Sequence, residues 1–151
     1  MTPNTSGSVL FQALRTWASG ASADRAALNL LVEHGHWLDR RDVVTGYVRW
    51  VPEEGQTRPA EPLATLDWAG LADALDRGDL AASSSQEAVL RIALSLAGVR
   101  PVDLRQALTG LGWASVGPVC GAVATAAQAE HQVLVTVVPP ARPAFLDEEE
   151  L

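Results

Sequence analysis

The sequence contains no lysine and only one cysteine. All eleven basic residues are arginine, and we attribute this first to the bias of a GC-rich coding sequence and only second to function. Because Cys120 has no second cysteine in the chain, an intrachain disulfide and a cysteine-based metal cage are both excluded. Residues 1–6 lack the positive start and the apolar run of a secretion signal. We therefore expect a cytoplasmic protein.

Basic charge is scarce as well. Eighteen acidic residues against eleven arginines give a formal net charge of −7. Nucleic acids and anionic membranes both require a positive field on the protein, so this balance disfavours binding to either. Part of the excess is local, because four acidic residues stand together at 147–150. The rest of the chain is only mildly acidic.

Long runs of large apolar residues are also missing. Residues 106–129 carry no charge, and this stretch is long enough to span a bilayer. Its apolar residues are mostly alanine and valine, however, and glycines interrupt them at several positions. Alanine and valine bury little area each. We therefore expect a turn followed by a buried helix here, and no transmembrane segment.

The composition that remains is that of a globular protein, with 48% hydrophobic and 19% charged residues over 151 residues. We predict a single mainly helical, compact domain over residues 1–138, followed by an acidic tail over 139–151. Apolar residues recurring every three or four positions indicate about six helices. The expected ranges are 8–19, 22–34, 68–77, 85–97, 104–109 and 117–128.

Two short segments have the alternating, β-branched pattern of strands. Residues 47–51 form the first, and residues 63–66 are expected to pair with it across an exposed loop at 52–62. A third segment, residues 133–138, has the composition of a terminal strand. The sequence therefore predicts a small two-stranded β element beside the helices.

Several helices carry recognisable signals at their ends and faces. Asp67 and Asp103 are suitable N-caps, and Ser84 with Glu87 has the spacing of a capping box. The helix over 85–97 is apolar nearly all round, so we expect it at the centre of the core. Trp17 and Trp68 are expected on core faces. The predicted inward stripe of the last helix is Val116, Val119, Cys120, Val123 and Ala127.

Residues with catalytic or metal-binding side chains give no convergent pattern. His34 and His36, with Asp39 or Glu61, suggest a metal site, but Gly35 ends the helix between the two histidines and removes a fixed spacing. Cys120 on an apolar stripe is expected to be an inert packing group. The chain also lacks a G-x-S-x-G elbow and a phosphate-binding loop. We predict no catalytic residues, no metal and no cofactor.

From Gln86 onward, the order of expected elements resembles a winged helix-turn-helix. One interpretation of the sequence is therefore a winged-helix-like C-terminal half. In that family the third helix enters the major groove with basic and amide side chains. The corresponding helix here carries no basic residue. This mismatch favours protein over DNA as the ligand.

One locally basic and aromatic region stands out on the acidic chain. Tryptophan and arginine are the residues that most often anchor protein interfaces. We therefore take this region as the candidate interaction surface. Its members are Trp37, Arg40, Arg41, Arg49 and Trp50.

Residues 66–128 contain the motifs SSSQEAVLRIALSLAG at 83–98, PVDL at 101–104 and ALTGL at 107–111. In these motifs, this part of the chain resembles small alanine-rich proteins of high-GC actinobacteria. These motifs consist of packing and capping residues, so the resemblance implies no activity and no site.

Three hypotheses for function follow from the sequence. The first is a non-enzymatic interaction or accessory protein that binds a protein partner or self-associates. The second is a DNA-associated transcriptional regulator built on the winged-helix-like half. The third is a small-molecule or metal-dependent enzyme.

Overall fold

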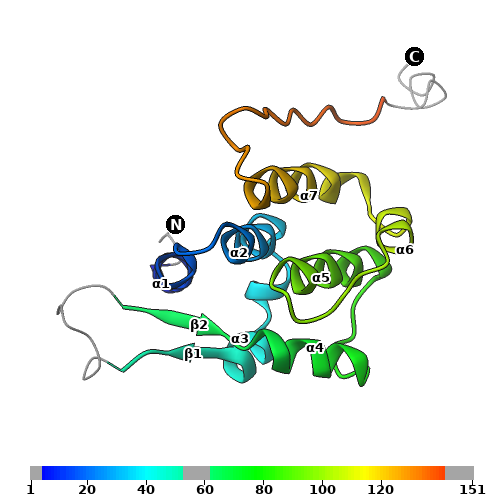
Figure 1. Ribbon diagram of the computed structural model, residues 1–151. Coiled ribbons are helices and arrows are strands. Elements are labelled where there is room, and N and C mark those ends of the chain that lie inside the picture. The colour runs from blue at the N-terminus through cyan, green and yellow to red at the C-terminus, as the bar shows by residue number, and fades with distance from the viewer. Residues whose placement is uncertain (1–4, 53–61, 142–151) are drawn as a thin grey trace, which may run out of the picture.

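A computed structural model describes residues 5–52 and 62–141 of the chain. These residues form seven α-helices, one short 3₁₀-helix and two strands, which confirms the predicted mainly helical fold class (Figure 1). The elements in chain order are α1 (Thr5–Ala18), α2 (Ser22–His34), η1 (Trp37–Asp39), α3 (Arg41–Tyr47), β1 (Val48–Trp50), β2 (Ala64–Leu66), α4 (Trp68–Asp76), α5 (Ser84–Leu96), α6 (Leu104–Thr109) and α7 (Trp113–Ala126).

The two strands pair as the sequence predicts. β1 and β2 are antiparallel, and Arg49 lies opposite Thr65 at the middle of the ladder. The backbone N–H of Val51 donates to the carbonyl of Leu63 over 2.8 Å, which continues the pairing toward the loop. Most of that loop, residues 53–61, lies outside the described residues, as do residues 142–151 of the expected acidic tail.

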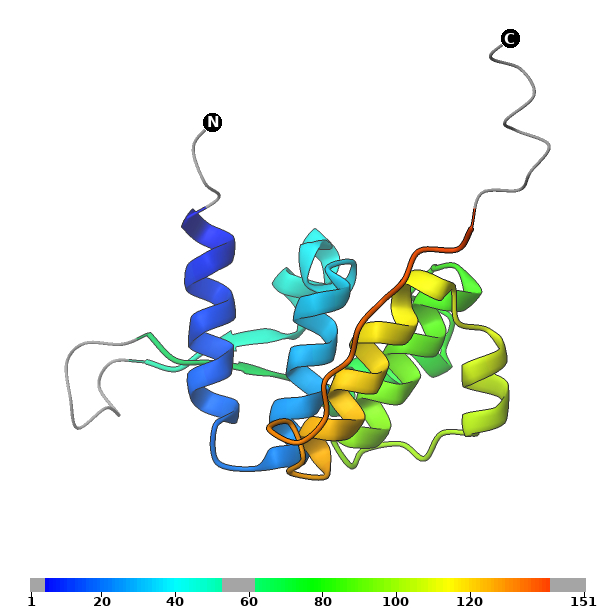
Figure 2. The same ribbon diagram turned by 90° about the horizontal axis from the view of Figure 1, so that it is seen from above.

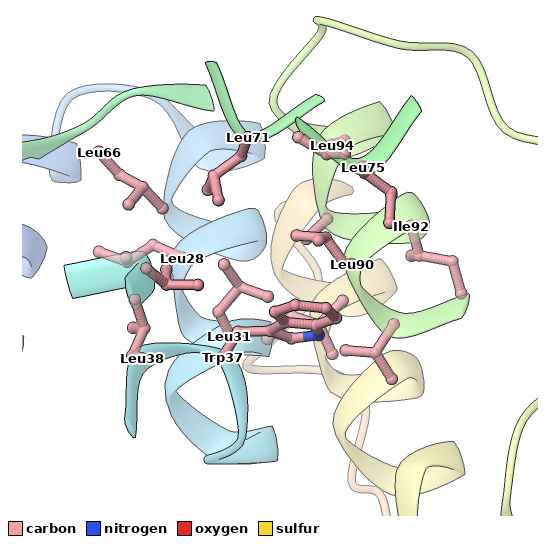
Figure 3. Close-up of a cluster of buried hydrophobic side chains, with 14 of the residues drawn as sticks. Leu28, Leu31, Trp37, Leu38, Leu66, Leu71, Leu75, Leu90, Ile92 and Leu94 are labelled. Carbon is pink, nitrogen blue, oxygen red and sulfur yellow. The ribbon is translucent and has the colours of Figure 1, made fainter. Parts of the chain in front are cut away.

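α2 is the helix around which the others pack. It contacts α1 on one side and both α5 and α7 on the other (Figures 1 and 2). The predicted central helix, α5, is indeed deeply buried through Val89, Leu90 and Leu94. The indole of Trp37 lies between Leu31 of α2 and Leu90 of α5 (Figure 3). The core is therefore mainly aliphatic and centred on α2 and α5.

Side-chain caps fix the starts of three helices. Asp67 and Asp103 accept hydrogen bonds from the backbone N–H groups of Gly70 and Gln106, as predicted. The capping box of α5 is Ser83 with Gln86, one residue before the predicted pair. The reason is that Ser83 and Gln86 each accept the other's backbone N–H, which satisfies two donors at once.

The N-terminal half differs from expectation at two places. The helix α3 was not predicted; it begins at Arg41 and is anchored by the buried Val43. Trp17 was expected in the core and is 55% exposed. The face of α1 that packs against the core continues from Leu14 to Ala18, one helical turn later. Trp17 lies to the side of this face and is therefore exposed.

The C-terminal layer differs most from expectation. α7 begins at Trp113 instead of Gly117, so Pro118 lies inside the helix. Residues 133–138, which we call the strap, are extended but form no strand. The strap runs back across α7 (Figure 2), where it meets helices and has no neighbouring strand to pair with. Among the described residues, no helix combines the length and the apolar character needed to cross a membrane.

Candidate functional site

The predicted interaction surface is divided by the structure, because Trp37 belongs to the core. Its side chain is 0% exposed, and its indole N–H donates to the backbone carbonyl of Gln86 over 2.9 Å. The 3₁₀-turn of η1 directs the ring inward, between α2 and α5. Trp37 is therefore a structural residue that no partner can reach.

Arg40 is also engaged within the molecule. Its guanidinium lies 5.1 Å from the Trp37 ring centroid, donates to both carboxylate oxygens of Asp42, and donates to the carbonyl of Ala81 over 2.7 Å. The hydrogen bond with Asp42 raises the pKa of Arg40 and lowers the pKa of Asp42. Arg40 thus ties the start of α3 to the segment before α5.

The other three members of the surface remain exposed, but they lie at two places. Arg41 is the first residue of α3, whereas Arg49 and Trp50 lie on β1, beyond the far end of that helix. Arg49 donates to the carbonyl of Val48 over 3.2 Å. The basic and aromatic residues that are close in the sequence therefore do not form one anchor with Trp37 at its centre.

His34 and His36 lie together where α2 ends, with their ring centroids 6.2 Å apart. Gln86 places its side-chain amide nitrogen 3.2 Å from Nδ1 of His36, while its side-chain oxygen already accepts the N–H of Ser83. The amide therefore donates, Nδ1 accepts, and the proton of the neutral ring is on Nε2. His36 is linked in this way to the cap of α5.

Burial lowers the pKa of both histidines. For His34 the neighbouring His36 adds to the effect, and for His36 the charge of Arg40 does so while Asp39 and Asp42 oppose it. In the part of the chain that the structure describes, no three histidine, cysteine, aspartate or glutamate side chains are grouped closely enough to hold a metal ion. Glu61, the other carboxylate considered for such a site, lies outside the described residues.

α7 presents an apolar stripe to solvent. Its members recur at intervals of three, four and three residues, so they share one face of the helix. All four are exposed: Trp113, Val116, Cys120 and Val123. We call this set the α7 stripe. Val116, Cys120 and Val123 were predicted to face the core, and for these three the prediction is wrong. Cys120 in particular is not the buried packing group that was expected.

The face of α7 that packs inward instead carries Ser115, Val119 and Ala122, and its serine and alanine let the helix approach α2 closely. The α7 stripe is consequently left outside. Because α7 is apolar on all faces, its sequence alone does not indicate which face is buried.

Exposed large apolar residues gather in the C-terminal layer. Of the thirteen in the described residues, ten fall at or after Leu104, and only Val9, Trp17 and Trp50 lie elsewhere. Besides the α7 stripe they include Leu104 and Leu108, one turn apart on α6, and five of the six strap residues. This concentration was not predicted, since Val116 and Val123 had been expected in a helix core and residues 133–138 in a strand.

The strap forms one wall of an open groove between α2 and α7. Val133, Val135 and Val137 face into it, together with Asn29 and Glu33 of α2 and the small residues of α7. A Cβ at Gly117 would collide with the side chain of Val137, so the absence of a side chain at 117 admits the strap. Leu134 and Val138 point away and are 90% and 79% exposed.

Comparison with known proteins adds no relative. No protein-family model, curated protein or solved structure matches the chain. The resemblance to actinobacterial proteins stays a prediction.

Proposed function

We propose that this protein is a non-enzymatic interaction module, and that the α7 stripe is the surface that binds its protein partner. The observation that carries this proposal is the exposure of Trp113, Val116, Cys120 and Val123 along one face of a helix. An apolar helix face of this kind is the usual means by which one helix packs against another.

The energetics of the stripe favour a protein ligand. A half-exposed tryptophan can bury a large area on binding, and tryptophan is among the most common anchors of protein interfaces. The absence of charge over residues 106–129 means that no ionised group on the face would have to lose its water. The same absence leaves α7 without a side chain that could neutralise a DNA phosphate.

The spacing of the stripe defines the chemistry of the partner. Intervals of three and four residues are the pattern by which helices interlock at a shallow crossing angle. The partner is therefore expected to present an uncharged, apolar helix face. Leu104 and Leu108 of α6, the helix that precedes α7, are exposed apolar residues as well.

The proposal is tested by affinity purification from the native host with three baits: the unchanged chain, Trp113→Ser and Trp17→Ser. The two tryptophans make a matched pair, since Trp17 is 55% exposed on α1 and Trp113 is 56% exposed on α7. The expected result is a partner that co-purifies with the unchanged chain and with Trp17→Ser and is lost with Trp113→Ser.

Two outcomes contradict the proposal. One is a partner held equally by all three baits, or lost only with Trp17→Ser. The other is a salt-dependent shift of duplex DNA by the purified protein, which would point to the nucleic-acid hypothesis instead.

A further inference from the structure

Four helices of the described chain end on a residue with left-handed backbone. In α2, α4 and α5 this residue is Gly35, Gly78 and Gly98, each with φ of 78°. In α7 it is Gln128, with φ of 57°, and Gln128 is the only non-glycine residue with positive φ among those described. A side chain at such a position strains the backbone, whereas glycine accepts it freely.

The hydrogen bonds at this end are otherwise those of an ordinary helix stop. The N–H of Gln128 donates to Thr125, and the N–H of Ala129 donates to Ala124 over 2.8 Å. Residues 127–132, however, have the sequence AQAEHQ, with no glycine, proline or β-branched residue. Alanine, glutamine and glutamate favour a continuing helix. The local sequence therefore opposes the turn.

The turn is held by contacts made at a distance along the chain. Arg25 of α2 pairs with Glu130 over 2.9 Å, and the hydroxyl of Ser22 donates to the carbonyl of Ala126 over 3.3 Å. The second carboxylate oxygen of Glu130 is buried without a hydrogen-bond partner. This closed arrangement thus carries both backbone strain and an unsatisfied polar atom.

The strap beyond the turn is held by side chains alone. Its inward valines line the α2–α7 groove while remaining 37–49% exposed, and from Leu134 to Val138 no backbone group forms a hydrogen bond with the described residues. The strap runs from the C-terminal end of α7 toward Gly117, so it is antiparallel to the helix. If α7 continued straight, its strap would leave along the axis of the helix. It would then run along the α7 of a second copy whose C-terminal end faces it, from the C-terminus of that helix toward its N-terminus.

We propose that two copies of this chain exchange straps. In the exchanged dimer, α7 continues as a helix through Gln132, and the strap of each copy lies along the α2–α7 groove of the other. The occupant is a second copy because this segment already lines the groove, with Val137 over Gly117, and exchange reproduces the same valine contacts in the partner. Exchange also removes the strain at Gln128 from both chains.

The inference is independent of the α7 stripe and is tested on the full chain by size exclusion with light scattering over about a hundredfold range of concentration. We expect a dimer whose share rises with concentration. Gln128→Gly should raise its Kd about tenfold or more, because glycine stabilises the closed turn of both copies and disfavours the straight helix.

A matched pair of variants then tests the groove. Val137→Asp places a charge on the inward face of the strap and should abolish the dimer, whereas Leu134→Asp changes the outward face and should retain it. Far-UV circular dichroism of each variant shows whether it is folded. If Val137→Asp unfolds the protein, the effect of Gln128→Gly on the dimer decides whether the straps are exchanged. A wild-type monomer at every concentration overturns the exchange. So does a dimer unaffected by Gln128→Gly and Val137→Asp, or one that only Trp113→Ser abolishes; this last result would leave the proposed stripe as the contact.

Discussion

The α2–α5 interior and the α7 layer use apolar residues in opposite ways. In the interior, leucines and Trp37 point inward and are almost completely buried. In α7, Ser115, Val119 and Ala122 face inward, while Trp113, Val116 and Val123 face solvent. The difference indicates that the first region supplies most of the stability of the fold, and it is the basis of our proposal that the second binds another surface.

The largest expected effect is in the interior. Leu31→Ala removes a side chain that is 0% exposed between α2 and α5, and it should lower the free energy of unfolding by about 3 kcal/mol, because lost burial and a residual cavity add together. Val123→Ala on the α7 stripe is the control and should change it by less than about 0.5 kcal/mol. Urea unfolding measures both. Equal losses would remove the distinction between the two regions.

Trp37→Phe tests a polar link within the same interior. Phenylalanine keeps most of the ring but leaves the carbonyl of Gln86 without the indole N–H, so we expect a loss of about 1–3 kcal/mol. Trp50→Phe, at a half-exposed site on β1, should have little effect on thermal unfolding. A Trp37→Phe protein as stable as the wild type would show that the buried hydrogen bond contributes nothing.

The fold of the helical domain could be predicted from the sequence wherever a signal was local. Asp67 and Asp103 as caps, Gly35 as a stop, and the pairing of residues 63–66 with the first strand all depend on a few adjacent residues. α3 was missed because its seven residues offer only Val43 as a buried anchor, too little for a periodic pattern.

The candidate site could not be predicted in the same way. The orientation of α7 depends on which face fits against α2, and a helix apolar on every side gives no such indication. Trp37 was placed on the surface because arginines surround it in the sequence, although the turn of η1 directs it into the core. The strap has the composition of a strand, but its neighbours in space are helices.

The stability of the interior should also depend on pH. His36 accepts from Gln86 only while Nδ1 is unprotonated, and its pKa in the folded protein is lowered. The neutral form is therefore favoured by folding. Stability should be complete above the unfolded pKa of about 6.5 and fall as the pH drops through the lower folded value.

Urea unfolding at several pH values measures this dependence. His36→Asn keeps an acceptor for Gln86 and should weaken the dependence, leaving the contribution of His34. His131→Asn, at an exposed turn position, should leave it unchanged. A wild-type protein that gains stability on acidification through this range would contradict the assignment of the neutral ring.

The smallest effects are expected at the helix ends, where the two regions differ by a single residue type. Gly98→Ala at the end of α5 should cost about 1 kcal/mol, because its φ of 78° strains a residue with a Cβ although the surrounding space is open. Gln128→Gly at the end of α7 should stabilise the monomer by a similar amount. Thermal unfolding of dilute protein compares them, and changes of the same sign would refute the contrast.

The reactivity of Cys120 toward a thiol reagent in the native, dilute protein tests most directly whether the apolar face of α7 points outward. Cys120 is the only thiol and lies within the α7 stripe. We predict that it reacts without unfolding, at a rate close to that of the denatured chain, and that a bound partner slows the reaction. A thiol that reacts only as fast as the whole protein unfolds would show that this face is buried, and would contradict the account.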